Sequence, residues 1–76
     1  MSDRRFVTTD AFLADGSVVP SRFCDEGDSA LLSAVVPVGY DPEFGDLVEV
    51  GGREWRIARR VWMGGPNWLL TLEAKE

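Results

Sequence analysis

Apolar and polar residues alternate along the last third of the chain, which is the pattern of β-strands with one buried face. The alternation runs through three segments: Leu47 to Val50, Arg53 to Met63, and Trp68 to Glu73. Gly51-Gly52 separates the first two and can supply the positive φ angles of a two-residue hairpin turn. Gly64-Gly65-Pro66-Asn67 forms a second turn before the last segment. We therefore predict a three-stranded antiparallel meander.

One face of this meander should lie in the core and the other in water. The predicted core face consists of Val48, Val50, Trp55, Ile57, Trp68, Leu70 and Leu72. The predicted solvent face includes Glu49, Glu54, Arg56 and Thr71. Strict alternation fails at Arg59-Arg60, because continuing it would bury Arg59 beside Val61. A β-bulge near Ala58 to Arg60 would restore the pattern and curve the sheet.

The first part of the chain is also predicted to form strands. Asp15-Gly16 is a turn signal between Phe6 to Leu13 and Ser17 to Cys24, so these segments should pair as a hairpin. Pro20 has no N–H to donate to a strand ladder, which places it at an edge or an irregularity of its strand.

Between the two predicted hairpin regions lie two loops and one further element. Asp25-Glu26-Gly27-Asp28-Ser29 is a polar loop, and Tyr40-Asp41-Pro42-Glu43-Phe44-Gly45-Asp46 is a second loop because Pro42 disfavours helix at the residue before it. Ala30 to Val38 is expected to be a strand, with a helical turn at Ala30 to Ala34 as the alternative. The fold class predicted is all-β, a small antiparallel β-barrel or sandwich of five to six short strands in one domain spanning residues 1–76, since closure hides strand edges.

Composition places the chain among folded proteins. Hydrophobic residues make up 45% of its 76 residues and charged residues 28%, which is too apolar for a disordered segment. No apolar run reaches the roughly 18 residues that a membrane span needs, and the N-terminal MSDRRFVTTD lacks the apolar stretch of a signal peptide. We expect a protein of the cytosol that does not bind membranes.

The sequence lacks the combinations of residues that common catalytic and metal-binding sites need. Cys24 is the single cysteine and the chain has no histidine, so neither a disulfide nor a common zinc site can form within it. Cys24 and the serines lack a base, and Asp25-Glu26-Asp28 lacks the ligand spacing of a calcium loop. The glycine pairs precede no expected helix, which argues against a phosphate cradle. We predict a protein that is not an enzyme and has no cofactor and no metal.

Charge is distributed unevenly along the chain, whose formal net charge is −5. Acidic residues gather in the first two thirds, whereas Arg53, Arg56, Arg59 and Arg60 follow close together. Arginine and tryptophan are enriched at interface hot spots, although outward arginines on a strand also serve ordinary solvation. Trp62, beside Met63 at a glycine-rich turn, is predicted to be exposed, and an exposed aromatic side chain suggests a contact surface.

From Gly16 onward the order of these features resembles the lambda-type phage head-tail joining (head completion) proteins. The resemblance rests on Gly16-Ser17-Val18-Val19-Pro20-Ser21-Arg22-Phe23-Cys24-Asp25-Glu26 and on Phe44-Gly45-Asp46-Leu47-Val48-Glu49-Val50-Gly51-Gly52-Arg53-Glu54-Trp55-Arg56-Ile57. A final strand, Trp68-Leu69-Leu70-Thr71-Leu72, follows in the expected place. Together these segments cover about two thirds of the chain.

The resemblance implies a small β-barrel or β-sandwich subunit that forms a ring between the capsid portal and the tail. The implied partners are portal or connector proteins, tail proteins and further copies of the chain, in the virion or in the host cytoplasm. On this basis Arg56, Arg60 and Trp62 are candidate partner-contact residues. Asp25, Glu26 and Asp28 are the candidates on a complementary loop.

Two other functions are compatible with the residues. A small acidic inhibitor from a mobile element, of the anti-CRISPR or DNA-mimic type, could use Asp25, Glu26, Asp28, Asp41, Glu43 and Asp46 to imitate phosphates and bind a basic host protein. An accessory domain could bind nucleic acid through the arginine-rich strand. The net charge disfavours this second function, and we predict no sequence-specific nucleic-acid binding.

Overall fold

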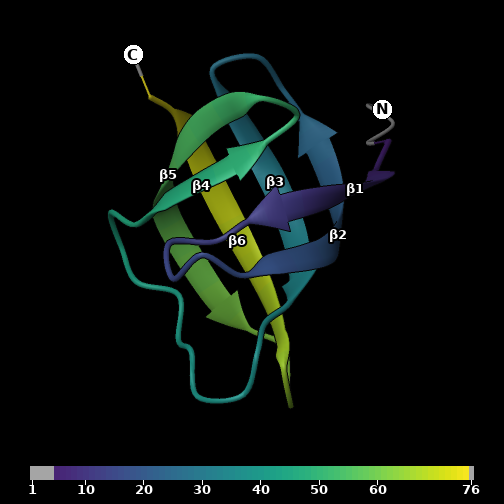
Figure 1. Cartoon of the computed structure of the whole chain (residues 1–76). Coiled ribbons are helices and arrows are strands. Elements are labelled where there is room, and N and C mark those ends of the chain that lie inside the picture. Colours follow the sequence, from purple (N-terminus) through teal and green to yellow (C-terminus); the bar gives the residue numbers. More distant parts are fainter. Residues whose placement is uncertain (1–4, 76) are drawn as a thin grey trace.

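Six antiparallel strands form a closed barrel in the computed structural model of the chain, which describes residues 5–75 (Figure 1). The strands are β1 (Val7–Phe12), β2 (Val18–Asp25), β3 (Ser29–Val35), β4 (Leu47–Val50), β5 (Arg53–Trp62) and β6 (Asn67–Ala74). Their order around the barrel is β1-β2-β3-β6-β5-β4. The prediction of a small all-β antiparallel fold is confirmed, and of the two forms considered the chain adopts the barrel.

The barrel joins two meanders, β1-β2-β3 and β4-β5-β6, along two seams. Along the first seam β3 pairs with β6 from Ser29↔Glu73 to Val35↔Asn67. Along the second, β1 and β4 share only the pairs Ala11↔Val50 and Phe12↔Glu49. Residues Ala30 to Ala34 are strand and not the alternative helical turn, because this segment lies between β2 and β6 and bonds to both.

The turns follow the chemistry predicted for them. Gly51 and Gly52 have φ angles of 63° and 79°, so both occupy the left-handed region that a tight hairpin requires. In the first hairpin the carboxylate of Asp15 accepts hydrogen bonds from the backbone N–H and the hydroxyl of Ser17. Pro20 pairs with Asp10 of β1, while pairing with β3 begins one residue later at Ser21. Pro20 therefore lies where β2 has a neighbour on one side only.

The predicted β-bulge is present in β5. Ile57 pairs with Leu72 and Arg59 with Thr71, so Ala58 is an extra residue without a partner of its own on β6. Such an insertion reverses the phase of side-chain alternation beyond it. Before the bulge Trp55 and Ile57 point into the barrel, and after it Arg60 and Trp62 pair with Leu70 and Trp68 of the inward-facing set.

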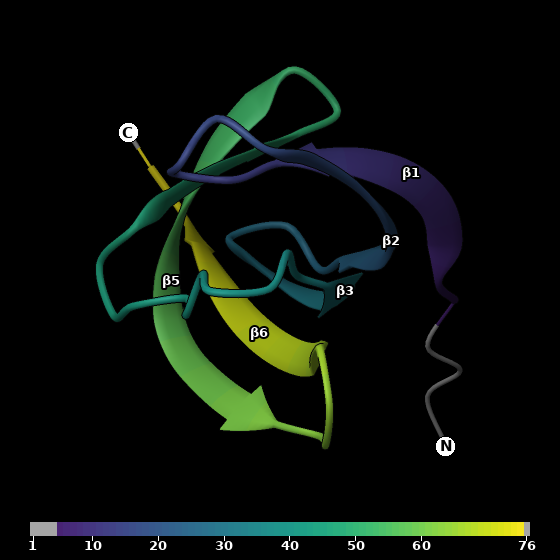
Figure 2. The same cartoon turned by 60° about the horizontal axis from the view of Figure 1, so that its bottom comes forward.

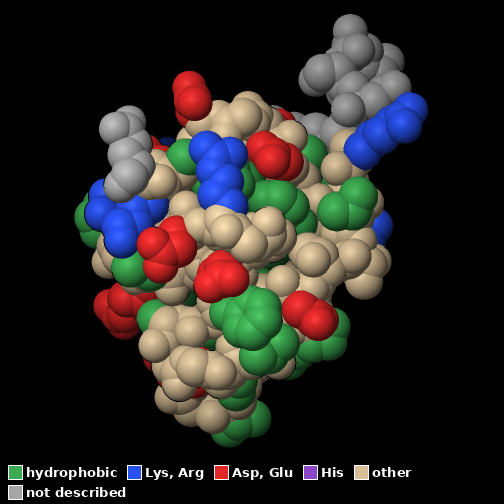
Figure 3. All heavy atoms as spheres, turned by 45° about the horizontal axis from the view of Figure 1, so that its top comes forward, with side chains coloured by type: hydrophobic (Ala, Val, Ile, Leu, Met, Phe, Trp, Pro, Cys, Tyr) green, Lys and Arg blue, Asp and Glu red, His purple; other side chains and the backbone are tan. Residues whose placement is uncertain are grey.

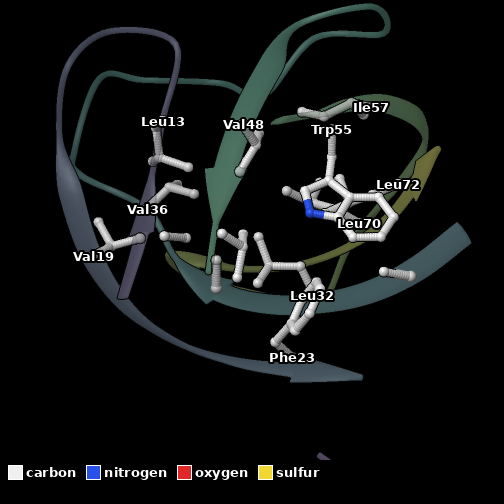
Figure 4. Close-up of a cluster of buried hydrophobic side chains, with 14 residues drawn as sticks. Leu13, Val19, Phe23, Leu32, Val36, Val48, Trp55, Ile57, Leu70 and Leu72 are labelled. Carbon is white, nitrogen blue, oxygen red and sulfur yellow. The ribbon is translucent and has the colours of Figure 1, made fainter. Parts of the chain in front are cut away.

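The barrel is filled by apolar side chains from all six strands (Figure 4). Trp55 is the largest of the fully buried side chains, and Phe23 meets it edge to face with ring centroids 5.6 Å apart. Of the predicted core face, Val48, Val50, Trp55, Ile57, Leu70 and Leu72 are buried. Trp68 is half-buried and packs against the edge of this core.

Residues 36–46 form a loop that crosses one end of the barrel and contains the predicted loop Tyr40 to Asp46 (Figure 2). The strand expected to reach Val38 ends at Val35, so the prediction was wrong for residues 36–38. The loop is bound at both ends to the β5-β6 hairpin. Val36 N–H donates to the carbonyl of Pro66, and Ile57 exchanges backbone hydrogen bonds with Gly45 and Asp46. Pro42 in the middle of the loop is fully buried.

The described residues contain no helix long and apolar enough to cross a membrane. The first four residues of the N-terminal stretch in which we expect no signal peptide lie outside the described part of the chain.

Replacing Trp55 should be far more damaging than replacing Trp62. The Trp55→Ala substitution removes a fully buried indole. Such changes cost about 3–5 kcal/mol, which is comparable to the whole stability that a core in so short a chain supplies. Trp62 is 62% exposed, so Trp62→Ala should cost less than about 1 kcal/mol. Urea unfolding followed by far-ultraviolet circular dichroism measures both, and equal losses in the two variants would be incompatible with this core.

Candidate functional site

The end of the barrel crossed by the 36–46 loop contains two of the predicted contact residues, Arg60 and Trp62. Both follow the bulge and pair with Leu70 and Trp68 of β6, in the part of the β5-β6 hairpin that projects past the rest of the barrel (Figure 1). The 36–46 loop lies against this stretch, because Val36 N–H donates to the carbonyl of Pro66 and Arg60 donates to that of Pro42. This arrangement creates a cleft between the loop and the hairpin.

Arg60 fastens the loop to the hairpin. Its guanidinium donates a hydrogen bond of 2.9 Å to the carbonyl oxygen of Pro42. The same group lies 5.7 Å from the centroid of the Trp68 ring, within the range of a cation–π contact. Arg60 is thus committed to contacts inside the chain, which gives it a structural role at this end of the barrel.

Trp62 presents most of its ring to solvent in a fixed orientation. The side chain is 62% exposed, as predicted, and its Nε1–H donates to the carbonyl of Gly65 at 2.8 Å. Met63 beside it and Val38 across the cleft are also exposed. An apolar surface of this kind is typical of a contact site.

The cleft itself has a volume of about 380 Å³. Its walls include three aromatic side chains, Tyr40, Trp62 and Trp68, together with Pro37 and Pro66, and Asp41 is the charged residue in its lining. This volume and mixture fall in the range of sites that take small molecules or short segments of a partner.

Tyr40 and Asp46 hold the loop that forms one wall of the cleft. The Tyr40 hydroxyl donates to Oδ2 of Asp46 at 3.0 Å, and the backbone N–H of Glu43 donates to the same oxygen at 3.1 Å. Burial raises the pKa of Tyr40 to about 12, and the hydrogen bond to Asp46 and the negative charge of Asp46 act in the same direction. The Asp46 carboxylate therefore accepts its hydrogen bonds from groups of the same loop.

The predicted acidic residues Asp25, Glu26 and Asp28 lie together in the β2-β3 turn, at the other end of the barrel. Asp25 Oδ1 accepts a hydrogen bond from Gly27 N–H, and the carbonyl of Asp28 accepts one from Ala74 N–H at the end of β6. This end is seen in Figure 3, where acidic and basic side chains are interspersed. Five of the six candidate contact residues thus form two groups, one at each end of the barrel, and Arg56 lies between them on β5.

The four arginines that follow one another in sequence do not form a single patch. Arg53 lies over the Trp55 ring at 4.5 Å and donates to the carbonyl of Gly27 in the acidic turn. Arg56 and Arg59 are exposed on the outer wall of β5, opposite Glu73 and Thr71 of β6 respectively. Only Arg60 reaches the cleft end.

The carboxylates proposed for a phosphate-mimicking surface are likewise divided. Asp25, Glu26 and Asp28 lie at the turn end, near Arg53. Asp41, Glu43 and Asp46 belong to the loop at the cleft end, which contacts Arg60. The two groups are separated by the length of the β5-β6 hairpin, and so they do not make one continuous acidic face.

Cys24 is buried on β2. Within residues 5–75, no three side chains of the types that bind metals are grouped closely enough to hold an ion.

Sequence reasoning did not identify Tyr40, Pro37 or Pro66 as parts of a site. The sequence predicts a loop at Tyr40 and a turn at Pro66, but nothing local indicates that the two segments face each other. Alternation predicts that Trp68 points into the core, and at this position the inward-facing side chain lines the cleft. The usable signal was the density of aromatic residues and prolines around two turn segments.

Searches of protein-family models, curated proteins and solved structures found no match to this chain.

The only tyrosine of the chain should titrate late. Because its folded pKa of about 12 lies above the ordinary value of 10.0, the folded state is favoured below pH 10 and this contribution is lost as the pH rises toward 12. Ultraviolet absorbance of tyrosinate should show the high midpoint, and Asp46→Asn should lower it by removing the charge while keeping an acceptor. A midpoint of 10 in the unsubstituted protein would contradict the Tyr40–Asp46 contact.

Proposed function

We propose that this chain is a structural subunit of a bacteriophage particle that joins the head to the tail. The observation that carries the proposal is the chemical difference between the two ends of one closed barrel. One end presents the acidic turn with Asp25, Glu26 and Asp28, and the other presents the cleft with Trp62. A subunit placed between two different neighbours needs two different contact ends.

The cleft end suits a protein partner. Trp62, Met63 and Val38 are exposed apolar side chains at this end, and tryptophan is among the residue types that contribute most to binding at interfaces. Arg60, Tyr40 and Asp46 hold the surface in shape before a partner arrives, which reduces the conformational entropy lost on binding.

The outer wall of β5 suits contact between copies of the chain. Arg56 and Arg59 are exposed there, between the two ends. In a ring each subunit uses two different patches against its two neighbours, so Arg56 and Arg59 of one copy can face acidic groups on the next. This assigns Arg56 to ring formation, and Trp62 and Asp28 to the head and tail contacts.

The inhibitor function receives less support from the geometry. A DNA mimic needs a continuous row of carboxylates, and the six candidate residues are divided between the two ends, with Asp46 engaged by Tyr40 and Glu43. A nucleic-acid-binding accessory domain is disfavoured because Arg53 and Arg60 are engaged within the chain.

The test is reconstitution with purified parts of the particle to which the chain belongs. The protein is mixed separately with portal-bearing tailless heads and with isolated tails, and binding is followed by co-sedimentation and by electron microscopy of rings. Trp62→Ala and Asp28→Lys should each weaken one of the two joints, by roughly tenfold or about 1.4 kcal/mol. Arg56→Glu should reduce ring formation on either partner.

Asp10→Lys provides a matched control, because Asp10 is an exposed carboxylate on the outer wall of β1, outside both end groups. This variant should assemble like the unsubstituted protein. Failure of the unsubstituted protein to bind heads and tails, or equal loss in all four variants, would refute the proposal.

A further inference from the structure

The cleft between the 36–46 loop and the β5-β6 turn is a preformed site. Three hydrogen bonds hold its walls: Arg60 to Pro42, Trp62 to Gly65, and Val36 to Pro66. The Tyr40–Asp46 hydrogen bond fixes the outer part of the loop. A site held in this way loses little conformational entropy when a ligand enters it.

The lining of the cleft favours an extended apolar segment. Three aromatic rings and two prolines supply flat apolar walls around a volume of about 380 Å³, which is too small for a folded domain. Aromatic-lined grooves of this kind recognise proline-rich segments in the polyproline II conformation, which is already extended before binding and needs no backbone hydrogen bonds from its receptor.

The negative charge around the cleft indicates which residues should flank such a segment. Asp41 is exposed in the lining, and Asp15 and Asp46 lie close enough to Tyr40 for their charges to raise its pKa. No lysine or arginine occurs among the described lining residues. The nearby Arg60 guanidinium, which bonds to the Pro42 carbonyl and lies over Trp68, carries one positive charge against the three carboxylates. The cleft is therefore complementary to a basic side chain.

From the aromatic lining and the acidic rim together, we propose that the cleft binds an extended proline-containing segment of a partner protein with an adjacent arginine or lysine. The inference deepens the proposed function, because it names the kind of segment that one of the two joined partners supplies to the cleft end. The acidic turn of a second copy is a poor occupant, since its carboxylates would meet Asp41. Nucleic acid is disfavoured for the same reason.

The binding test is a nuclear magnetic resonance titration with a capped peptide of three Pro-Pro-Arg repeats. The indole N–H signals of Trp62 and Trp68 should shift, while that of the buried Trp55 should stay in place as an internal reference. Peptides of three Gly-Gly-Arg repeats and three Pro-Pro-Glu repeats separate the proline contribution from the charge contribution. Both should bind at least roughly tenfold more weakly than the Pro-Pro-Arg peptide.

Two variants and one control locate the binding. Trp62→Ala should abolish the shift of Trp68, and Asp41→Asn should weaken binding of the Pro-Pro-Arg peptide roughly threefold by removing the complementary charge. Val61→Ala is the matched control, because Val61 is an exposed apolar residue on the same strand as Trp62 that does not line the cleft. It should bind the peptide unchanged.

Several results would overturn the inference. The first two are the absence of a shift of the Trp62 and Trp68 signals with the Pro-Pro-Arg peptide, and equal binding of the Gly-Gly-Arg peptide. The third is a shift of these signals with protein concentration alone, which would indicate a second copy in the cleft. The fourth is a shift on addition of oligothymidylate, which would indicate nucleic acid. If heads or tails bind while the peptide does not, this inference fails and the proposed function stands. If the peptide binds while neither heads nor tails do, the proposed function fails and the peptide site stands.

Discussion

One extra residue in β5, Ala58, determines which way the end of that strand faces. Without the bulge the alternation set by Trp55 and Ile57 would turn Arg59 and Val61 toward the concave side of the hairpin. With it, Arg60 and Trp62 take that side opposite Leu70 and Trp68, and Arg59 and Val61 face outward. The phase change places a cation and an aromatic ring where the hairpin leaves the barrel, and the cleft end depends on both.

The 36–46 loop covers an apolar face that the bulge and the long β5-β6 hairpin leave without a strand over it. The inward face of β5 and β6 extends past the end of the barrel, where no strand can cover it. The loop covers this face. Its backbone N–H and C=O groups find hydrogen-bond partners in Ile57, Pro66 and Arg60. The loop is thus part of the fold as much as part of the site. At the opposite end Arg53 serves a similar purpose, since it covers Trp55 and bonds to the acidic turn.

The local pattern of residues is sufficient to predict the elements that depend on neighbours in sequence. Alternation identified the inward residues of β4 to β6, Gly51-Gly52 located the tight turn, and the conflict between Arg59 and Val61 located the bulge. The sequence favours closure only because a barrel hides strand edges. It could not show which strands meet, since the β3-β6 and β1-β4 seams join residues distant in sequence. For the same reason the sequence could not show that Tyr40 faces Trp62 across a cleft. It also could not show that four arginines close in sequence point to three different places.

The environment of the Trp68 ring, measured through nuclear Overhauser effects in solution, tests the bulged register of β5 most directly. The bulged register predicts contacts from the side-chain methylenes of Arg60, and none from those of Arg59, to the Trp68 indole protons. Contacts from Arg59 to Trp68, with Arg60 turned to solvent, would show an unbulged β5, and the cleft together with both functional proposals that use it would have to be abandoned.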